Sequence, residues 1–224
     1  MQHQIIKSSL MGVGLIGLVG MTQAAELTAN AGVTSNYVFR GLTQTDDGIA
    51  PQGGIDYVHE IGFYAGAWAS NVEDSTVGDK GYETDLYAGY NFKLNENVMF
   101  DVGYIAYLYS STATFDDADE IYFGASFKDV SLTYYVGNRD VGADYTYIDL
   151  KYSMELSNDF NLHLHYGNMA DDAAGGDYED IAVGVSKDVA GFDVGLTVTT
   201  VDHDTPALED DKVFITVTKI FNLM

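Results

Sequence analysis

The sequence predicts an all-β fold, a twelve-stranded antiparallel up-and-down β-barrel that spans a membrane. Three observations lead to this prediction. Apolar residues alternate with polar or small ones, short and long connections alternate along the chain, and aromatic residues recur at equivalent positions next to the short connections. A strand that crosses a bilayer in a barrel shows such alternation over about ten residues, because one face meets lipid and the other faces the lumen. Helical spacing of apolar residues is not sustained in any segment.

The first 24 residues are predicted to be a signal peptide. Lys7 is their only charged residue, residues 10–21 are apolar and rich in glycine, and Thr22-Gln23-Ala24 has the small-x-small pattern of a cleavage site. The apolar run is shorter than the roughly 18 residues that a membrane-spanning helix needs. We therefore expect an exported protein whose single mature domain, residues 25–224, is the barrel.

The strands are predicted from the alternation itself. In residues 192–199 the apolar side chains share one parity, starting at Phe192, and the polar or small ones share the other. The first strand is expected to run from Leu27 as far as Arg40, with Tyr37 and Phe39 on its apolar face. The segments are predicted to begin near residues 27, 49, 63, 82, 98, 119, 130, 144, 160, 178, 192 and 212.

The connections alternate in length, as expected for an outer-membrane barrel with short periplasmic turns and longer extracellular loops. Both termini then lie on the short-turn side. The short turns are predicted at residues 59–62, 94–97, 128–129, 155–159 and 188–191. The longer, acidic loops are predicted around residues 41–48, 72–81, 110–118, 138–143, 170–177 and 202–211.

Aromatic residues are predicted to mark the two membrane boundaries. A girdle at the short-turn rim is expected to consist of Phe63, Phe92, Phe100, Phe127, Phe160, Phe192 and Phe221. The opposite rim is expected to carry Tyr37, Phe39 and Tyr166.

Composition excludes two classes of protein. The chain has no cysteine, which rules out a small secreted scaffold held by disulfides. Without Lys7 it has 9 basic and 34 acidic residues, so the mature net charge is 9 − 34 = −25. Nucleic acid is therefore not expected as a partner, because binding it requires a basic surface.

The first part of the mature chain resembles the proteobacterial TorF-type porin family, long described as conserved proteins of unknown function. The resemblance rests on Val33-Thr34-Ser35-Asn36-Tyr37-Val38-Phe39-Arg40-Gly41, Gln44-Thr45-Asp46, Gln52-Gly53-Gly54, Gly62-Phe63-Tyr64-Ala65-Gly66 and Trp68-Ala69-Ser70-Asn71. It implies an outer-membrane barrel and passive transport, and it implies neither catalytic residues nor a particular substrate.

If the apolar faces meet lipid, the other parity defines a lumen rich in carboxylates. The pore-lining candidates are Asp56, Glu83, Asp85, Asp101, Glu120, Tyr147, Asp149, Lys151, His163, His165, Asp180 and Asp193. Because carboxylates in a narrow pore attract cations and repel anions, an open lumen is expected to favour cations mildly. The alternative is that some of these acids pair with Lys151 or with inward tyrosines and plug the barrel.

Two basic residues have alternative roles. Lys151, beside Asp149, either contributes to a transverse field at a constriction or forms a neutralised structural pair. Arg40 is the outer-mouth candidate, which either lines that mouth or anchors the first long loop to nearby carboxylates.

His163 and His165 share a strand face and point inward, where they could ligate a metal or act as a base. No third ligand lies at recognisable spacing, so neither a metal site nor a cofactor is expected. No serine motif accompanies the histidines, so we do not expect an enzyme. The acidic loops are expected to be solvated, with divalent-cation binding as the alternative.

The sequence thus favours an outer-membrane porin or channel through which small polar solutes or cations diffuse passively, with outer-membrane lipids around it. The alternative is a closed structural or adhesion barrel whose acidic loops bind divalent cations or a partner. A barrel enzyme is a third hypothesis. The sequence makes no prediction of the solute, of gating or of the oligomeric state.

Overall fold

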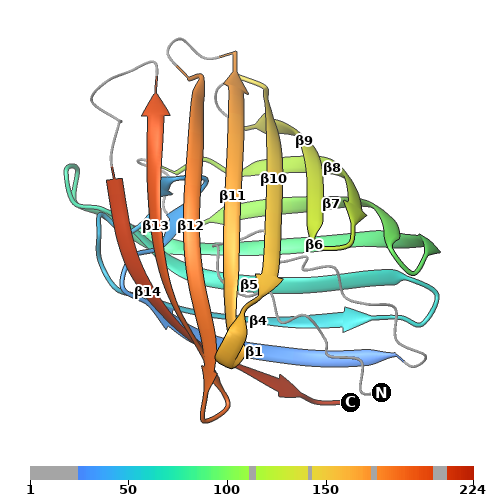
Figure 1. The fold of residues 1–224 in the computed structure, drawn as a ribbon. Helices are drawn as coiled ribbons and strands as arrows, with labels where there is room; N and C mark the ends of the chain where they lie inside the picture. The colour runs from blue at the N-terminus through green and yellow to red at the C-terminus, as the bar shows by residue number, and fades with distance from the viewer. Residues whose placement is uncertain (1–24, 111–114, 141–142, 173–175, 204–210) are drawn as a thin grey trace.

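The chain forms a closed β-barrel of antiparallel strands around a lumen (Figure 1). The computed structural model describes residues 25–110, 115–140, 143–172, 176–203 and 211–224. The predicted signal peptide, residues 1–24, lies outside the described residues. Within these ranges, no helix has the length and apolar character needed to cross a membrane.

Twelve strands pair edge to edge around the wall, which confirms the predicted fold class and strand number. In the order in which neighbours pair, they are β1 (Glu26–Thr34), β14 (Asp211–Asn222), β13 (Phe192–His203), β12 (Tyr178–Val189), β11 (Phe160–Asp171), β10 (Tyr145–Glu155), β9 (Val130–Arg139), β8 (Ala118–Phe127), β7 (Val98–Tyr109), β6 (Asp79–Asn95), β5 (Phe63–Asp74) and β4 (Ala50–Val58). Pairing of β4 with β1 closes the barrel, so the wall has no free edge. A 3-10 turn, Ser157–Asp159, lies between β10 and β11.

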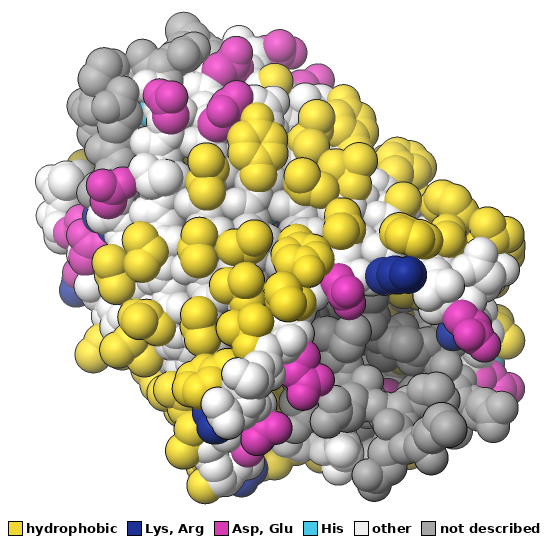
Figure 2. Space-filling view, in the orientation of Figure 1, with side chains coloured by type: hydrophobic (Ala, Val, Ile, Leu, Met, Phe, Trp, Pro, Cys, Tyr) yellow, Lys and Arg dark blue, Asp and Glu magenta, His cyan; other side chains and the backbone are white. Residues whose placement is uncertain are grey.

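The two faces of the wall differ as the alternation predicts. On β13, Leu196 and Val198 are 50% and 48% exposed on the outside, whereas Thr197 between them is 0% exposed. Figure 2 shows hydrophobic side chains over most of the visible wall and acidic side chains towards its ends. An apolar outer surface of this kind is compatible with contact with lipid, and the polar side chains face the lumen.

The phenylalanine girdle at the short-turn end is confirmed. All seven predicted side chains are exposed at strand ends beside the short turns: Phe63, Phe92, Phe100, Phe127, Phe160, Phe192 and Phe221. Of the residues predicted at the opposite rim, Tyr166 lies on the outer face of β11 but five residues before the strand ends at Asp171, and the prediction is wrong for Tyr37 and Phe39. Tyr37 is buried, and the Phe39 ring packs against Tyr107 inside the barrel.

Tyr37 and Phe39 lie inside because β1 ends at Thr34 and residues 35–49 turn into the lumen. We call residues 35–49 the infolded loop. It contains a small hairpin, β2 (Val38–Phe39) and β3 (Leu42–Thr43), whose tip residues Arg40 and Gly41 have positive φ angles of 49° and 81°. Positive φ at both central residues is the geometry of a tight hairpin turn.

Local hydrogen bonds hold the infolded loop in shape. The Asn36 amide donates to Asp47 Oδ1 (2.7 Å), and the Thr43 hydroxyl donates to Asn36 Oδ1 (2.7 Å). The Thr45 hydroxyl donates to the Gly48 carbonyl (2.8 Å) and accepts from the Tyr37 backbone N–H (3.0 Å). Short polar side chains compete with strand ladders in this way, which is why the alternation in the sequence does not continue as a strand.

The connection between β5 and β6 also differs from the sequence prediction. In place of a long loop over residues 72–81, the two strands continue to Asp74 and from Asp79, with residues 75–78 as the turn. The strand ends that flank the other predicted long connections lie at this same end of the barrel. We refer to this end as the long-loop end.

Candidate lumen site

The infolded loop crosses the lumen and ends in an ion pair on the far wall. It leaves the wall between β1 and β4, and β8, β9 and β10 lie on the opposite side in strand order. There the Arg40 guanidinium binds both carboxylate oxygens of Glu120, with Nη1–Oε1 at 2.7 Å and Nη2–Oε2 at 2.9 Å. The two side chains are only 6% and 0% exposed. A planar guanidinium suits such two-point contact, so this pair fixes the loop tip in position and orientation.

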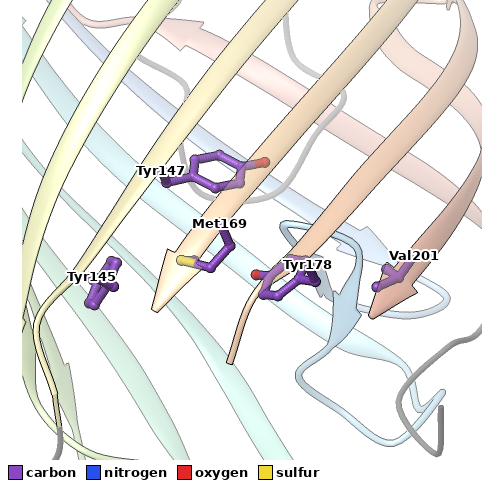
Figure 3. Packing of buried hydrophobic residues seen from close by; sticks show 5 residues of the cluster. All are labelled: Tyr145, Tyr147, Met169, Tyr178 and Val201. Carbon is purple, nitrogen blue, oxygen red and sulfur yellow. The ribbon is translucent and has the colours of Figure 1, made fainter. Parts of the chain in front are cut away.

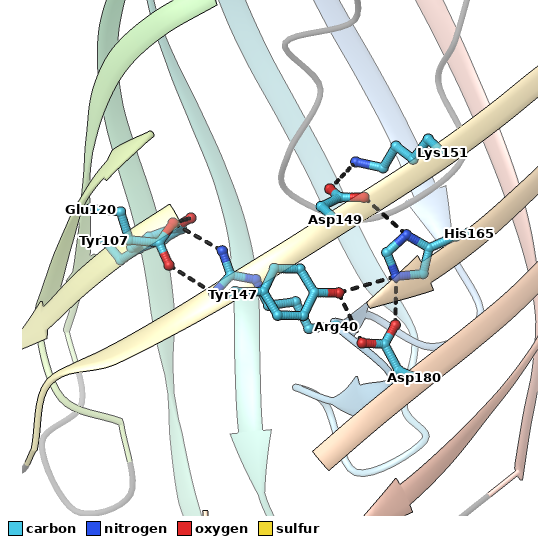
Figure 4. A network of polar contacts seen from close by, with 8 residues as sticks. All are labelled: Arg40, Tyr107, Glu120, Tyr147, Asp149, Lys151, His165 and Asp180. Atoms are coloured by element: carbon cyan, nitrogen blue, oxygen red, sulfur yellow. Dashed lines mark hydrogen bonds and ion pairs between the residues drawn. The ribbon is translucent and has the colours of Figure 1, made fainter. Parts of the chain in front are cut away.

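Aromatic rings enclose the guanidinium. Its central carbon lies 4.1 Å from the ring centroid of Tyr147 and 4.9 Å from that of Tyr135, and the Tyr107 hydroxyl donates to Glu120 Oε2 (2.9 Å). Figure 4 shows Arg40 between Glu120 and Tyr147. Of the two alternatives for Arg40, the structure shows the anchoring contact. The side chain does not line an outer mouth because it is buried against the wall.

Other contacts attach the infolded loop to different strands. Lys212 on β14 forms an ion pair with Asp47 (2.8 Å), and the Gln44 carbonyl accepts from the Glu73 backbone N–H on β5 (2.8 Å). Gly41 packs so closely against Asp180 and Val201 that a Cβ atom at this position would collide with both. The loop is therefore bound to several sides of the barrel.

A second polar network lies beside the loop tip (Figure 4). His165 Nδ1 lies 3.1 Å from Asp149 Oδ1, and its Nε2 lies 2.6 Å from Asp180 Oδ2. The Tyr147 hydroxyl donates to Asp180 Oδ1 (2.8 Å), and Lys151 forms an ion pair with Asp149 at 2.5 Å. The contact of Lys151 is that of a neutralised pair, the second of its predicted alternatives.

A cavity of about 50 Å³ lies between this network and the loop tip. Arg40, Lys151, Asp149, His165 and Asp180 contribute to its lining. Charges of both signs and an imidazole thus face one small space, which suits water or the polar end of a small solute more than an apolar ligand.

Packed side chains narrow the long-loop half of the lumen further. Figure 3 shows one buried cluster inside the wall, composed of Tyr145, Tyr147, Met169, Tyr178 and Val201. Leu42 of the infolded loop packs against this cluster. The lumen at this level is therefore a constriction formed by tyrosines and the loop together.

The remaining predicted lumen residues also face inward, in separate groups. Asp101 accepts from the Tyr64 hydroxyl (2.8 Å), which is 2.6 Å from that of Tyr122. Asp56 accepts from Tyr87, and Glu83 and Asp85 are buried side by side on β6. Asp193 lies partly buried on the inner face of β13.

His163 has serine partners that the sequence did not indicate. Its Nδ1 lies 3.1 Å from Ser153 Oγ and its Nε2 lies 3.3 Å from Ser186 Oγ, one serine on each neighbouring strand. The described residues contain no group of three or more histidine, cysteine, aspartate or glutamate side chains that could hold a metal ion.

Among the inward tyrosines, only Tyr147 was a named candidate, and the others were expected only as unnamed partners of the lumen acids. Several stand directly across from a glycine on the next strand, as Tyr122 does from Gly103 and Tyr145 does from Gly137, and the ring covers that glycine. A Cβ atom there would meet the ring. The signal was present in the sequence, because these tyrosines and glycines share the parity of the acidic residues.

Comparisons with known proteins agree with this architecture. A family model described as "Bacterial protein of unknown function (Gcw_chp)" matches residues 19–221. No curated protein is similar in sequence at the level that the comparison required.

Solved structures similar in fold include two structures of one porin and one of an outer-membrane channel. The KdgM porin has a TM-score of 0.61 at 12% identity, over 87% of this chain and 99% of that one. The KdgM porin in complex with disordered oligogalacturonate has a TM-score of 0.59 at 11% identity, over 90% and 100%. An outer-membrane channel from Pseudomonas putida F1 has a TM-score of 0.55 at 13% identity, over 89% and 96%. At these identities the likeness shows the fold alone.

Proposed function

We propose that this chain, which belongs to the Gcw_chp family of bacterial proteins of unknown function, is a narrow outer-membrane channel for passive diffusion of small polar solutes. The observation that carries the proposal is a closed barrel with an apolar outer wall and a polar lumen that is crossed by a loop. A loop held across a lumen sets a diameter limit without closing the whole barrel. The fold of this chain also resembles that of outer-membrane porins.

The same proposal places the chain in the membrane. The short turns face the periplasm, the acidic long loops face outward, and residues 1–24 direct export and are removed. We also propose that the resemblance of residues 33–71 to TorF-type porins reflects membership of that group.

Charge in the lumen supports a mild preference for cations. Arg40 neutralises Glu120, and Lys151 neutralises Asp149. Lys212 pairs with Asp47 of the loop. Further carboxylates on the inner face, among them Asp56, Glu83, Asp85 and Asp101, are not members of these three pairs. An excess of carboxylates in a low-dielectric pore raises the local concentration of cations and opposes anions.

The charge of the lumen also affects which solutes can pass through the channel. The KdgM porin is described in complex with oligogalacturonate, an acidic sugar chain. For the present chain we propose neutral or cationic solutes of small size, because the excess of carboxylates on its inner face opposes an acidic sugar and its constriction opposes a long one.

Solute entry into proteoliposomes tests this function. Vesicles containing the refolded chain, residues 25–224, are expected to swell in an isotonic neutral hexose and to swell about tenfold more slowly in the uronate of the same sugar, because the lumen repels the anion. Protein-free vesicles measure leakage. Equal rates for the two sugars would contradict the charge argument, and rates no faster than leakage would contradict the channel.

A second candidate function, a closed structural or adhesion barrel, is favoured by the packed tyrosines at the long-loop end. In that case the acidic loops, and not the lumen, form the functional surface. We propose no enzymatic role. His165 lies between two carboxylates, and His163 lies between two serines without a carboxylate partner among the described residues.

A further inference from the structure

Two carboxylates on β6 form a buried pair outside the networks described above. Glu83 and Asp85 are two residues apart, so their side chains share the inner face of the strand, and both are 0% exposed. They are close enough to interact electrostatically with each other. Two like charges in a buried environment repel each other strongly, because little water screens them.

The pair lacks the partners that other lumen acids have. Glu83 Oε1 accepts one hydrogen bond, from the Tyr109 hydroxyl at 3.1 Å. Glu83 Oε2 and both Asp85 oxygens accept no hydrogen bond of regular geometry from any residue that the structure describes, although the two carboxyl groups lie close enough to interact with each other. Within the described residues, neither Glu83 nor Asp85 forms an ion pair. By contrast, Glu120 binds Arg40 and Asp149 binds Lys151.

The infolded loop contributes a further oxygen atom next to the Glu83–Asp85 pair, the hydroxyl of Tyr37. Tyr37 is 1% exposed and lies close enough to Glu83 for the two side chains to interact, although its hydroxyl forms no hydrogen bond of regular geometry within the described residues. The Tyr37 ring packs edge-on against Trp68 of β5, with centroids 5.5 Å apart. Burial raises the pKa of the Tyr37 phenol, and Glu83 adds to that shift, so this group is a neutral oxygen.

These observations point to a ligand. Buried polar groups are almost always paired, and an unpaired buried carboxylate costs several kcal/mol. Carboxylate oxygens are ligands that hard divalent cations prefer, and the double positive charge of such a cation matches the two acids. We propose that Glu83 and Asp85, with Tyr37 above them, bind a divalent cation such as Ca²⁺ inside the barrel.

The proposal goes beyond a channel function, because a site of this kind can fill in an open or a closed barrel. The cation would neutralise the wall beneath the infolded loop and join the loop to β6. It would thus add a second attachment of the loop to the wall, two strands away from the Arg40–Glu120 contact on β8. Few protein ligands are available, so the expected affinity is in the range of weak calcium sites, with a dissociation constant of about 0.1–1 mM.

Terbium luminescence tests the site in detergent, where conduction plays no part. Tb³⁺ substitutes for Ca²⁺, and excitation of the adjacent Trp68 and tyrosines is expected to sensitise its emission. Added Ca²⁺ should displace that signal. The double variant E83Q/D85N is expected to lower the apparent affinity for Tb³⁺ at least about tenfold, because affinity follows the number of charged ligands.

Asp101 provides the matched control. It is a lumen carboxylate that already accepts from Tyr64, so D101N is expected to retain the sensitised Tb³⁺ signal. Unchanged emission in E83Q/D85N would overturn the proposal, because the signal would then arise from acids elsewhere. Heat-modified migration on gels confirms that each variant is a folded barrel.

Denaturant midpoints give a second measurement. Ca²⁺ is expected to raise the urea midpoint of the unmodified chain and to leave that of E83Q/D85N unchanged, since a ligand stabilises only a protein that binds it. In EDTA the double variant should be the more stable of the two, because repulsion is removed. If Ca²⁺ has no effect on the midpoint and acidification alone stabilises the chain, the two acids share a proton and the proposal is wrong.

Discussion

Replacing Arg40 with methionine (R40M) is expected to destabilise the folded barrel and to enlarge the conductance of the channel. The variant keeps side-chain volume but leaves Glu120 buried without its cationic partner, although the Tyr107 hydroxyl still donates to it. Removing one partner of a buried ion pair costs about 3–5 kcal/mol. Because this pair also holds the tip of the infolded loop, its loss should release the loop from the far wall. Urea titration in lipid vesicles measures the first effect, and unit conductance measures the second.

Two further variants separate the ion pair from general damage. R40M/E120M is expected to recover part of the stability lost in R40M, because no buried charge is left alone, while conductance stays high. K80M removes an ion pair with Glu73 in which Lys80 is 69% exposed, and it should cost less than about 1 kcal/mol and leave conductance unchanged. A folded R40M barrel with ordinary stability and ordinary conductance would show that the loop is held by other contacts.

Replacing Gly41 with alanine (G41A) is expected to displace the loop tip without changing any charge. Gly41 has a φ of +81°, where an alanine costs about 1–2 kcal/mol. The new methyl group would also collide with Val201 and Asp180, and overpacking of this kind costs about 1–3 kcal/mol more. We expect both costs to lower the free energy of unfolding. We also expect an altered unit conductance, because a shift at Gly41 displaces the adjacent Arg40 that holds the loop tip.

Gly78 offers a matched control for backbone strain. It has a φ of +70° in the turn between β5 and β6, and nothing lies within 4 Å of a Cβ atom built there. G78A should therefore show the backbone cost of about 1–2 kcal/mol alone and an unchanged conductance. Equal losses in G41A and G78A would mean that the tip of the loop is not seated against β12 and β13.

The strands were predictable because the residue types along each strand depend directly on what each face of the strand contacts. An outer position meets lipid and an inner position meets the lumen, so local alternation carries the information and no distant contact is needed. The predicted and observed starts differ most at β6, predicted near residue 82 and observed at Asp79. There the pairing of Glu73 with Lys80 extends the ladder beyond the apolar pattern.

The infolded loop was not predictable from the same signal. Residues 35–40 continue the alternation, yet Asn36, Thr43 and Thr45 form hydrogen bonds with one another across the loop. The decisive contact, Arg40 with Glu120, joins residues 80 positions apart. Parity showed correctly that Glu120 points inward, but it carries no information on which inward group meets which across a lumen.

The same lack of information on cross-lumen partners explains why the polar network of Asp149, His165 and Asp180 could not be predicted as a unit. Parity placed Asp149, His165 and Asp180 on the inner face, and register across β10, β11 and β12 then brought them into one network. Strand starts predicted to within a few residues do not define that register, because a slip of two residues keeps each side chain on its face and changes its neighbours.

Single-channel recording of the refolded chain, residues 25–224, in a planar bilayer under a potassium chloride gradient tests the central claim most directly. We expect discrete conductance steps and a reversal potential on the cation-selective side. A folded barrel that inserts and shows no steps would contradict the channel, and steps with an anion-selective reversal potential would contradict the role assigned to the lumen carboxylates.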